Sequence, residues 1–239
     1  MMRGPAAALI VVARGTGWVV VAKPPGLLTH RNRYAPRAPA ALQQVRDQEG
    51  REVYPIHRLD AAASGCLLFA TDRAMAGPLS AALTAGEKIY LALVRGVCPA
   101  DATFVAAGAL KDDTGRMKAA KTALRCLGSD PDRRCALVEA RPETGRYHQI
   151  RRHLRRLSHP IIGDRHHGDS HVNRSWRARG VRRLALHCLS IRLTLPDGQT
   201  LAADCPLFDD LAGPLSGLAM WPAAQAALPV LNEEALPTP

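Results

Sequence analysis

Short apolar runs recur along the chain and are separated by turns rich in Gly, Pro and Asp. Most of these runs are too short for a stable helix and contain many aliphatic and β-branched residues, which is typical of strands buried in a sheet. The first two runs flank Arg14-Gly15-Thr16-Gly17 and predict a hairpin, and Asp197-Gly198 predicts another near the C-terminus. The predicted strands are residues 9–13, 18–22, 53–56, 66–70, 88–96, 122–126, 135–140, 184–195 and 200–204.

Helical signals are fewer than strand signals. Asp72 can cap a helix over residues 73–85, although Gly77-Pro78 should bend that helix or delay its start. Residues 144–157 carry an apolar stripe at helical spacing and predict a second helix. The remaining predicted helices are residues 40–49 and 206–218, and the Ala- and Pro-rich residues 221–239 are predicted to form a loosely packed tail.

The composition adds a strong positive charge. The 239 residues include 32 Lys and Arg against 21 Asp and Glu, which gives a formal net charge of +11 and a pI near 10.0. This favours an anionic partner, nucleic acid first and an acidic membrane surface second, and a generally Arg-rich proteome is the alternative explanation. Residues 141–183 hold twelve Arg but only Glu143, Asp164 and Asp169 as acids, so the charge forms a patch and favours nucleic acid.

The cysteines do not form a recognisable metal or redox motif. They stand at positions 66, 98, 126, 135, 188 and 205, and none belongs to a Cys-x-x-Cys pair. Most lie in predicted strands, so they are predicted to be reduced core residues of a cytosolic protein. No apolar stretch approaches the roughly 20 residues that span a bilayer. A cytoplasmic location without membrane attachment is therefore expected.

The stretch His57-Arg58-Leu59-Asp60 connects two of the predicted strands. A carboxylate between two core strands is unfavourable unless it is paired or used in chemistry. Arg58 is two residues from Asp60, so both side chains would share one face of an extended chain. Two interpretations stay open on these residues alone, a structural ion pair at the end of a strand or a reactive carboxylate.

Two other predicted elements and one loop carry candidate chemistry. Tyr90 lies in a predicted strand, where it would either pack in the core or stack on a nucleobase. Arg151 and Arg155 lie one turn apart on a predicted helix, and such close arginines are more easily explained by nearby phosphates than by a solvated helix. His166 and His167 resemble zinc ligands, but no fourth ligand is evident, so no metal is predicted.

Taken together, four motifs resemble those of the RluA-type pseudouridine synthases. The resemblance covers roughly residues 8–210 and departs at Ala63, where the family usually has Thr. It implies an α+β fold with one catalytic domain, residues 1–220, in which helices flank a mixed, mainly antiparallel central sheet. No S4-type RNA-binding domain is expected ahead of Lys23. The motifs are Lys23-Pro24-Pro25-Gly26, His57-Arg58-Leu59-Asp60 before Ser64-Gly65, Lys88-Ile89-Tyr90, and Thr144-Gly145-Arg146-Tyr147-His148-Gln149-Ile150-Arg151 before His159-Pro160-Ile161-Ile162-Gly163-Asp164.

The resemblance also implies an activity, the isomerisation of a uridine in RNA to pseudouridine, which requires no cofactor. It makes Asp60 the catalytic residue, pairs Arg151 with it, and places Tyr90 in the active site, with Leu59 and Ile150 as apolar walls of the substrate pocket. Asp60 could attack C1′ or remove the C2′ proton, and the sequence leaves both open. The predicted RNA-binding residues are His57, Arg58, Lys88, Arg146, His148, Arg152, Arg155, Arg156 and His167.

Within the family, residues 159–164 with His167-Gly168-Asp169 and Asn173-Arg174 most resemble the tRNA pseudouridine synthase C subgroup. The predicted partner is therefore RNA, with tRNA favoured and ribosomal RNA as the alternative. No protein partner is implied, so a monomer is predicted. The rival classes are a non-catalytic RNA-binding protein on the same fold and a glycosidase or base-excising hydrolase, whose chemistry usually needs a second carboxylate near the first.

Overall fold

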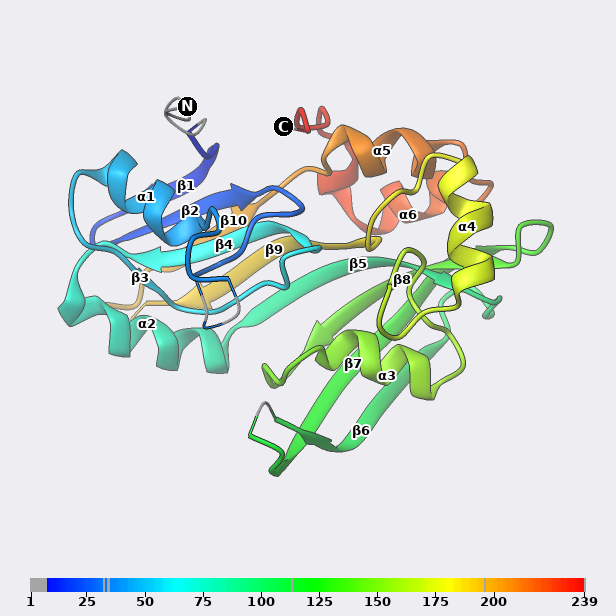
Figure 1. Cartoon of the computed structure of the whole chain (residues 1–239), viewed down its shortest axis with the longest axis horizontal. Coiled ribbons are helices and arrows are strands. Elements are labelled where there is room, and N and C mark those ends of the chain that lie inside the picture. The colour runs from blue at the N-terminus through cyan, green and yellow to red at the C-terminus, as the bar shows by residue number, and fades with distance from the viewer. Residues whose placement is uncertain (1–7, 32, 34, 113, 196, 239) are drawn as a thin grey trace.

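The structure is a computed structural model, and it describes all residues except 1–7, 32, 34, 113, 196 and 239. One ten-stranded sheet dominates it, with the strand order β1-β2-β4-β9-β5-β8-β7-β6, while β10 pairs with β9 and β3 with β4 (Figure 1). The strands are β1 Val11–Gly15, β2 Trp18–Lys23, β3 Tyr54–Pro55, β4 Ser64–Ala70, β5 Glu87–Arg95, β6 Thr103–Lys111, β7 Met117–Asp130, β8 Cys135–Pro142, β9 Leu186–Thr194 and β10 Thr200–Asp204.

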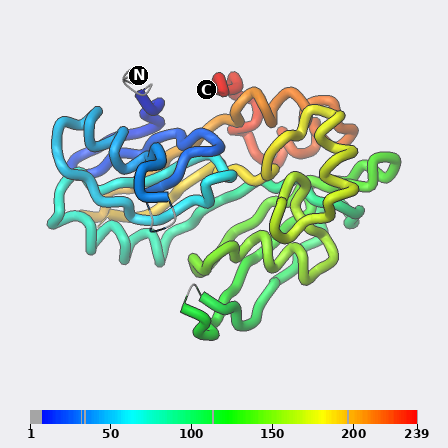
Figure 2. Tube along the Cα trace, in the orientation of Figure 1, coloured from blue at the N-terminus to red at the C-terminus, as the bar shows by residue number. Residues whose placement is uncertain are grey.

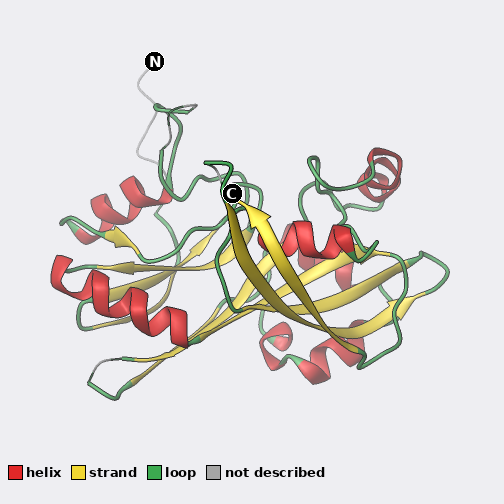
Figure 3. Cartoon of the chain, turned by 90° about the horizontal axis from the view of Figure 1, so that it is seen from below, coloured by secondary structure: helices red, strands yellow, loops and turns green. Residues whose placement is uncertain are grey.

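Helices lie against both halves of this sheet. Helix α2 contacts β4 and β9, whereas α3 contacts β6, β7 and β8. Figure 3, seen from below, shows how strongly the sheet twists between these two halves, as extended sheets of L-residues do. The helices are α1 Ala41–Glu49, α2 Arg73–Ala85, α3 Gln149–Arg156, α4 Ser170–Ala178, α5 Asp209–Ser216, α6 Trp221–Ala227 and the 3₁₀ helix η1 Pro229–Asn232.

The two halves of the sheet join where β4 and β9 pair in parallel, while the other named strand pairs are antiparallel. Gly65 at this junction has a φ of +111°, and a Cβ there would lie 2.2 Å from the carbonyl oxygen of Cys188. Only glycine accepts both this φ and this approach. The predicted α+β class with a mixed, mainly antiparallel sheet is confirmed.

Several predicted elements have different bounds in the structure. The strand expected over residues 53–56 is reduced to Tyr54–Pro55, because proline has no N–H to extend the ladder. The helix expected from residue 144 begins only at Gln149, whose side-chain oxygen accepts hydrogen bonds from the Thr144 hydroxyl and the Arg146 N–H and so holds a loop there. Gly77-Pro78 does not delay α2, which begins at Arg73 directly after the Asp72 cap.

The loosely packed C-terminal tail is a wrong prediction. Residues 221–232 form α6 and η1, and Trp221, Ala224 and Leu231 are buried in the core. Helix α6 packs against β7, and Figure 2 shows this C-terminal segment, in orange and red, folded back against the rest of the chain. The alanines and prolines that suggested disorder instead allow a small helix to pack closely.

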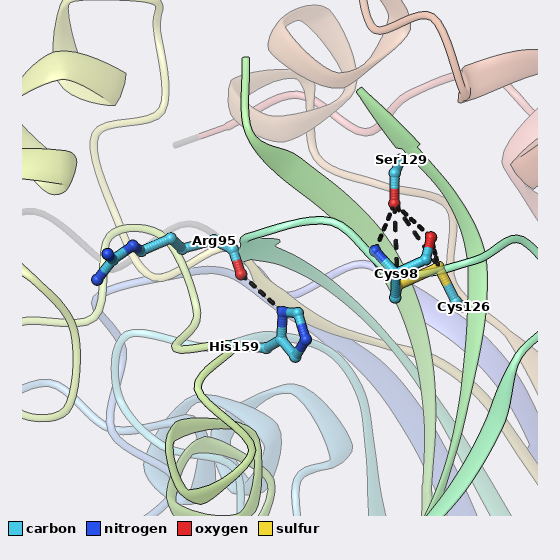
Figure 4. The surroundings of a disulfide bond; sticks show 5 residues. All are labelled: Arg95, Cys98, Cys126, Ser129 and His159. Carbon is cyan, nitrogen blue, oxygen red and sulfur yellow. Dashed lines mark hydrogen bonds between the residues drawn. A yellow bond between two sulfur atoms is a disulfide. The ribbon is translucent and has the colours of Figure 1, made fainter. Parts of the chain in front are cut away.

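The prediction of six reduced cysteines is also wrong. Cys98 and Cys126 form a disulfide, whereas Cys66, Cys135, Cys188 and Cys205 are free and buried as expected. The segment after β5 folds back onto β7 through the hydrogen bonds Asp101 N–H to Cys126 O and Cys126 N–H to Ala102 O, which bring the two thiols together. Figure 4 shows the Ser129 hydroxyl beside the bond. Because the two cysteines are 28 positions apart in the sequence, no local motif predicts that they pair.

Candidate active site

The loop that carries Asp60 between β3 and β4 is held by hydrogen bonds from Thr29 and Lys23. The Thr29 hydroxyl donates to the Leu59 carbonyl and accepts from the Leu59 N–H, both at 3.1 Å. Lys23 at the end of β2 is fully buried, and its Nζ donates to the carbonyls of Pro24, Leu27 and Ala61. Burial, with the charge of Arg183, lowers the pKa of Lys23 to about 7, against the opposite effect of Asp60. The loop backbone at Asp60 is therefore fixed before any ligand binds.

Arg151 joins Asp60 to a second carboxylate. Its Nη1 lies 2.8 Å from Asp60 Oδ2, and its Nε and Nη2 lie 2.8 Å from the two oxygens of Asp164. Arg151 is 5% exposed and the Asp164 side chain is 0% exposed. Burial acts to raise the pKa of Asp164, but Arg151 and the N–H groups of His166 and His167 outweigh it and lower that pKa to about 2. The predicted Arg151–Asp60 pair is therefore present in the structure.

His148 approaches the other oxygen of Asp60, with 3.8 Å between Nε2 and Oδ1. Its backbone has a φ of +53°, an uncommon conformation for a residue with a Cβ, and its ring stacks on Tyr147 with 3.7 Å between centroids. Its Nδ1 lies 3.0 Å from Nε2 of His167. Burial lowers the pKa of His148 to about 4 despite the nearby charge of Asp60, so the ring is neutral at neutral pH.

A cleft of about 490 Å³ opens over Asp60. Leu59, Tyr90 and Ile150 line it, as the sequence predicts. Tyr90 is only 7% exposed, and burial, followed by the adjacent Cys188 thiol, raises the pKa of its phenol well above the usual value. The Asp60 carboxylate thus lines a cavity with apolar walls and one protonated phenol.

Five of the predicted RNA-binding residues line this cleft, namely His148, described above, and His57, Arg58, Lys88 and Arg146. Arg58 is exposed, and its guanidinium lies over the ring of Tyr147, 5.9 Å from the centroid. Lys88 donates to the carbonyl of Leu83 and Arg146 to that of Ala119. His57 is turned inward, where its Nε2 accepts the N–H of Leu68, and burial lowers its pKa to about 3.

The remaining predicted RNA-binding arginines lie on α3. Arg152 and Arg156 donate to the carbonyls of Lys111 and Ala109 on β6, and Arg155 donates to the carbonyl of His167. Arg155 and Arg156 are exposed. All three side chains therefore connect α3 to neighbouring segments by hydrogen bonds to backbone carbonyls, in addition to any contact with a ligand.

The sequence interpretation gave no role to Lys23, Tyr147 or Asp164. Lys23 and Asp164 stand inside recognised motifs. The position of a lysine directly after an apolar strand could have identified Lys23, and a lone acid among arginines could have identified Asp164. Tyr147 has no such signal. Across the part of the chain that the structure describes, no cluster of His, Cys, Asp and Glu could hold a metal ion. In the same residues, no helix is long and apolar enough to cross a membrane.

Residues 17–156 match the family described as RNA pseudouridylate synthase. The tRNA pseudouridine synthase C of Pasteurella multocida is 36% identical over 78% of this chain and 86% of its own length. That of Salmonella typhimurium is 38% identical over 77% and 80%. Among solved structures, human RNA Pseudouridylate Synthase Domain Containing 1 has a TM-score of 0.68 and 24% identity, with 90% of each chain covered.

Proposed function

Because the chain belongs to the RNA pseudouridylate synthase family, we propose that it isomerises a specific uridine in tRNA to pseudouridine. The relatives that match most of its length are named tRNA pseudouridine synthase C, and this supports tRNA over ribosomal RNA. The net charge of +11 suits a polyanionic substrate. A cytoplasmic, monomeric enzyme is the form in which we expect this activity.

The observation that carries the proposal is the arrangement around Asp60. Arg151 holds Oδ2 at 2.8 Å, and Asp60 lines the cleft together with Leu59, Tyr90 and Ile150. In the reaction the N1–C1′ bond of uridine breaks, C5 bonds to C1′, and the proton leaves C5 while N1 gains one. No electrons are exchanged with a partner, so the reaction requires no redox cofactor. Asp60 supplies either the nucleophile for C1′ or the base for the C2′ proton.

A flipped uracil fits the chemistry of the cleft walls. Tyr90 offers an aromatic face for stacking, and the two aliphatic side chains exclude water from the base. Arg58, exposed at the mouth of the cleft, is placed to occupy the gap that the base leaves in the RNA. The arginines of α3 would then contact the backbone of the same RNA.

The proposal is tested by deleting the gene and mapping pseudouridine in total tRNA and in ribosomal RNA. We expect one tRNA site to lose its pseudouridine and to regain it when the wild-type gene, but not an Asp60→Asn variant, is returned. An unchanged tRNA profile with one lost ribosomal site would instead identify ribosomal RNA as the substrate. Unchanged profiles in both would contradict the activity itself.

A further inference from the structure

Asp60 belongs to a connected group of five residues, only part of which the proposed reaction uses. Arg151 connects Asp60 to Asp164 through hydrogen bonds of 2.8 Å. Asp164 Oδ1 accepts the backbone N–H groups of His166 and His167 at 2.9 and 3.0 Å, which fixes the start of the loop that carries His167. His167 contacts His148, and His148 returns to Asp60.

Only one placement of the ring protons on His148 and His167 suits both the contact between the rings and the negative charge of Asp60. Both are neutral near pH 7, because burial lowers the pKa of His148 to about 4 and also lowers that of His167. If His148 carried its proton on Nδ1, the lone pair on Nε2 would point at the negative Asp60 oxygen 3.8 Å away. If the proton is on Nε2, the N–H points at that oxygen, and Nδ1 accepts a hydrogen bond from His167 Nε2–H at 3.0 Å.

We propose that His148 is a positioning residue that orients Oδ1 of Asp60 through its Nε2–H, and that His167 fixes the tautomer of His148. The inference rests on the proposed function for its catalytic consequence, but the tautomer can be measured without it. It gives both residues a role different from direct RNA contact. The arrangement resembles the outer groups that fix the tautomer and orientation of a functional histidine in other sites.

The packing around His148 is consistent with an orienting role. Its ring is held between stacked Tyr147 and the edge-on ring of His167, with centroid distances of 3.7 and 5.2 Å. Its uncommon backbone, with φ at +53°, directs the side chain toward Asp60 at the start of α3. The other charged or titratable groups around the pair are Arg151, Arg155, Asp164 and His166. The 3.8 Å separation is too long for a hydrogen bond, and we expect it to shorten when RNA fills the cleft.

The chemical benefit lies in the charge on Asp60. Arg151 restrains one oxygen, and a donor at the second limits rotation of the carboxylate about its Cβ–Cγ bond. When the free carboxylate is regenerated at the end of the reaction, by either mechanism, the N–H also stabilises the returning negative charge. Loss of the donor should therefore slow the chemical step more than it weakens RNA binding.

The first experiment compares His167→Phe, which removes the donor to His148, with His167→Gln, whose amide can restore it. His171→Gln, on the exposed start of α4, serves as the matched control. Single-turnover pseudouridine formation in tRNA should fall about tenfold to a hundredfold in His167→Phe, recover to within about threefold of wild type in His167→Gln, and not change in the control. The Kd for tRNA should stay within about twofold in all three.

The second experiment reads the tautomer directly. Long-range ¹H–¹⁵N spectra of the histidine-labelled full chain, with His148 assigned from the signal missing in His148→Gln, should show the proton on Nε2 in the wild type. In His167→Phe the signal should shift toward the other tautomer. A wild-type proton on Nδ1, equal activity losses in both His167 variants, or a salt-dependent loss of tRNA affinity in both would overturn the inference. An inactive wild-type enzyme with the expected tautomer would instead contradict the proposed function.

Discussion

Arg151 is the residue on which the geometry of Asp60 depends most directly. Its guanidinium has three donor atoms in short hydrogen bonds, two to Asp164 and one to Asp60. A lysine could not satisfy both carboxylates with the same planar geometry. Asp164 is the more deeply buried acid, so it fixes the arginine, while Asp60 is the more accessible of the two carboxylates.

This order of dependence predicts the effect of Asp164→Asn. The variant removes the buried charge that holds Arg151, so we expect the free energy of unfolding to fall by about 3 kcal/mol, the lower end of the range for a broken buried pair because Asp60 remains. Pseudouridine formation should fall as well, since Arg151 loses its orientation. Urea unfolding and a single-turnover assay measure the two effects.

The control for Asp164 is Asp132→Asn, at an exposed position in the turn between β7 and β8. It should change the free energy of unfolding by no more than about 0.5 kcal/mol. An Asp164 variant that is as stable and as active as this control would show that Arg151 does not depend on Asp164.

Helix α3 separates structural from exposed arginines within one and a half turns. Arg151, His153 and Leu154 face inward and are buried, whereas Arg155 and Arg156 are exposed. The inner face meets Asp60, and the outer face meets the backbone of β6 and the loop after Asp164. The same helix therefore contacts Asp60 and contributes to the surface that we expect to contact RNA.

The two faces should respond differently to alanine substitution. Arg151→Ala should abolish most activity while the Kd for tRNA changes little, and this difference should not depend on salt. Arg155→Ala and Arg156→Ala should each weaken binding. In each variant the slope of log Kd against log salt should fall by about one, as expected for the loss of one phosphate contact. Filter binding at several salt concentrations, with single-turnover rates, separates these outcomes. Equal and purely salt-sensitive losses in all three variants would contradict the division of the helix.

Local signals explain which elements the sequence predicts well. The Asp72 cap and Gly86 bound α2 at the predicted residues, and the strand around Tyr90 is an unbroken apolar run. Strand β6 was missed although its sequence is largely apolar. It lies at the sheet edge with only Ala106 and Leu110 buried, so its residues show no alternation of polar and apolar side chains. Motif spacing located Asp60 and Arg151, but the contacts His148–His167 and Cys98–Cys126 depend on how separate loops fold together.

The whole molecule is held by one long sheet whose two halves meet close to the site. Ser64 at the junction contacts Nδ1 of His187 at 2.8 Å, and Nε2 of the same ring bonds to the carbonyl of Cys205 at 3.0 Å. Burial lowers the pKa of His187 to about 3. His57 near Asp60 is half-buried, and burial of its ring also lowers its pKa to about 3 and keeps it neutral. At acidic pH the unfolded chain therefore binds protons at these two histidines that the folded chain does not bind.

This difference predicts how stability depends on pH. Unfolded histidines titrate near pH 6.5, so below that pH the unfolded state binds more protons than the folded state until the folded pKa near 3 is reached. The contribution of His57 and His187 is thus fully present above about pH 7 and is lost on acidification. Between pH 6 and 5 the free energy of unfolding should fall by about 2.5 kcal/mol for the pair.

Urea unfolding at half-unit steps of pH measures this slope before most carboxylates begin to titrate near pH 4. The exposed-site variant His171→Gln should show the same slope of the free energy of unfolding against pH as the wild type. A free energy of unfolding that does not change between pH 6 and 5 would show that these two histidines are not kept neutral by the fold.

The central claim is that Asp60 performs the reaction, and Asp60→Asn in a single-turnover assay with tRNA tests it most directly. The substitution keeps the shape of the side chain but removes the charge that either proposed mechanism requires. We predict that pseudouridine formation falls by about three orders of magnitude or more while the Kd for tRNA stays within a few-fold of wild type. Asp132→Asn should behave as wild type in both measurements. Turnover by Asp60→Asn within about tenfold of wild type would contradict the account.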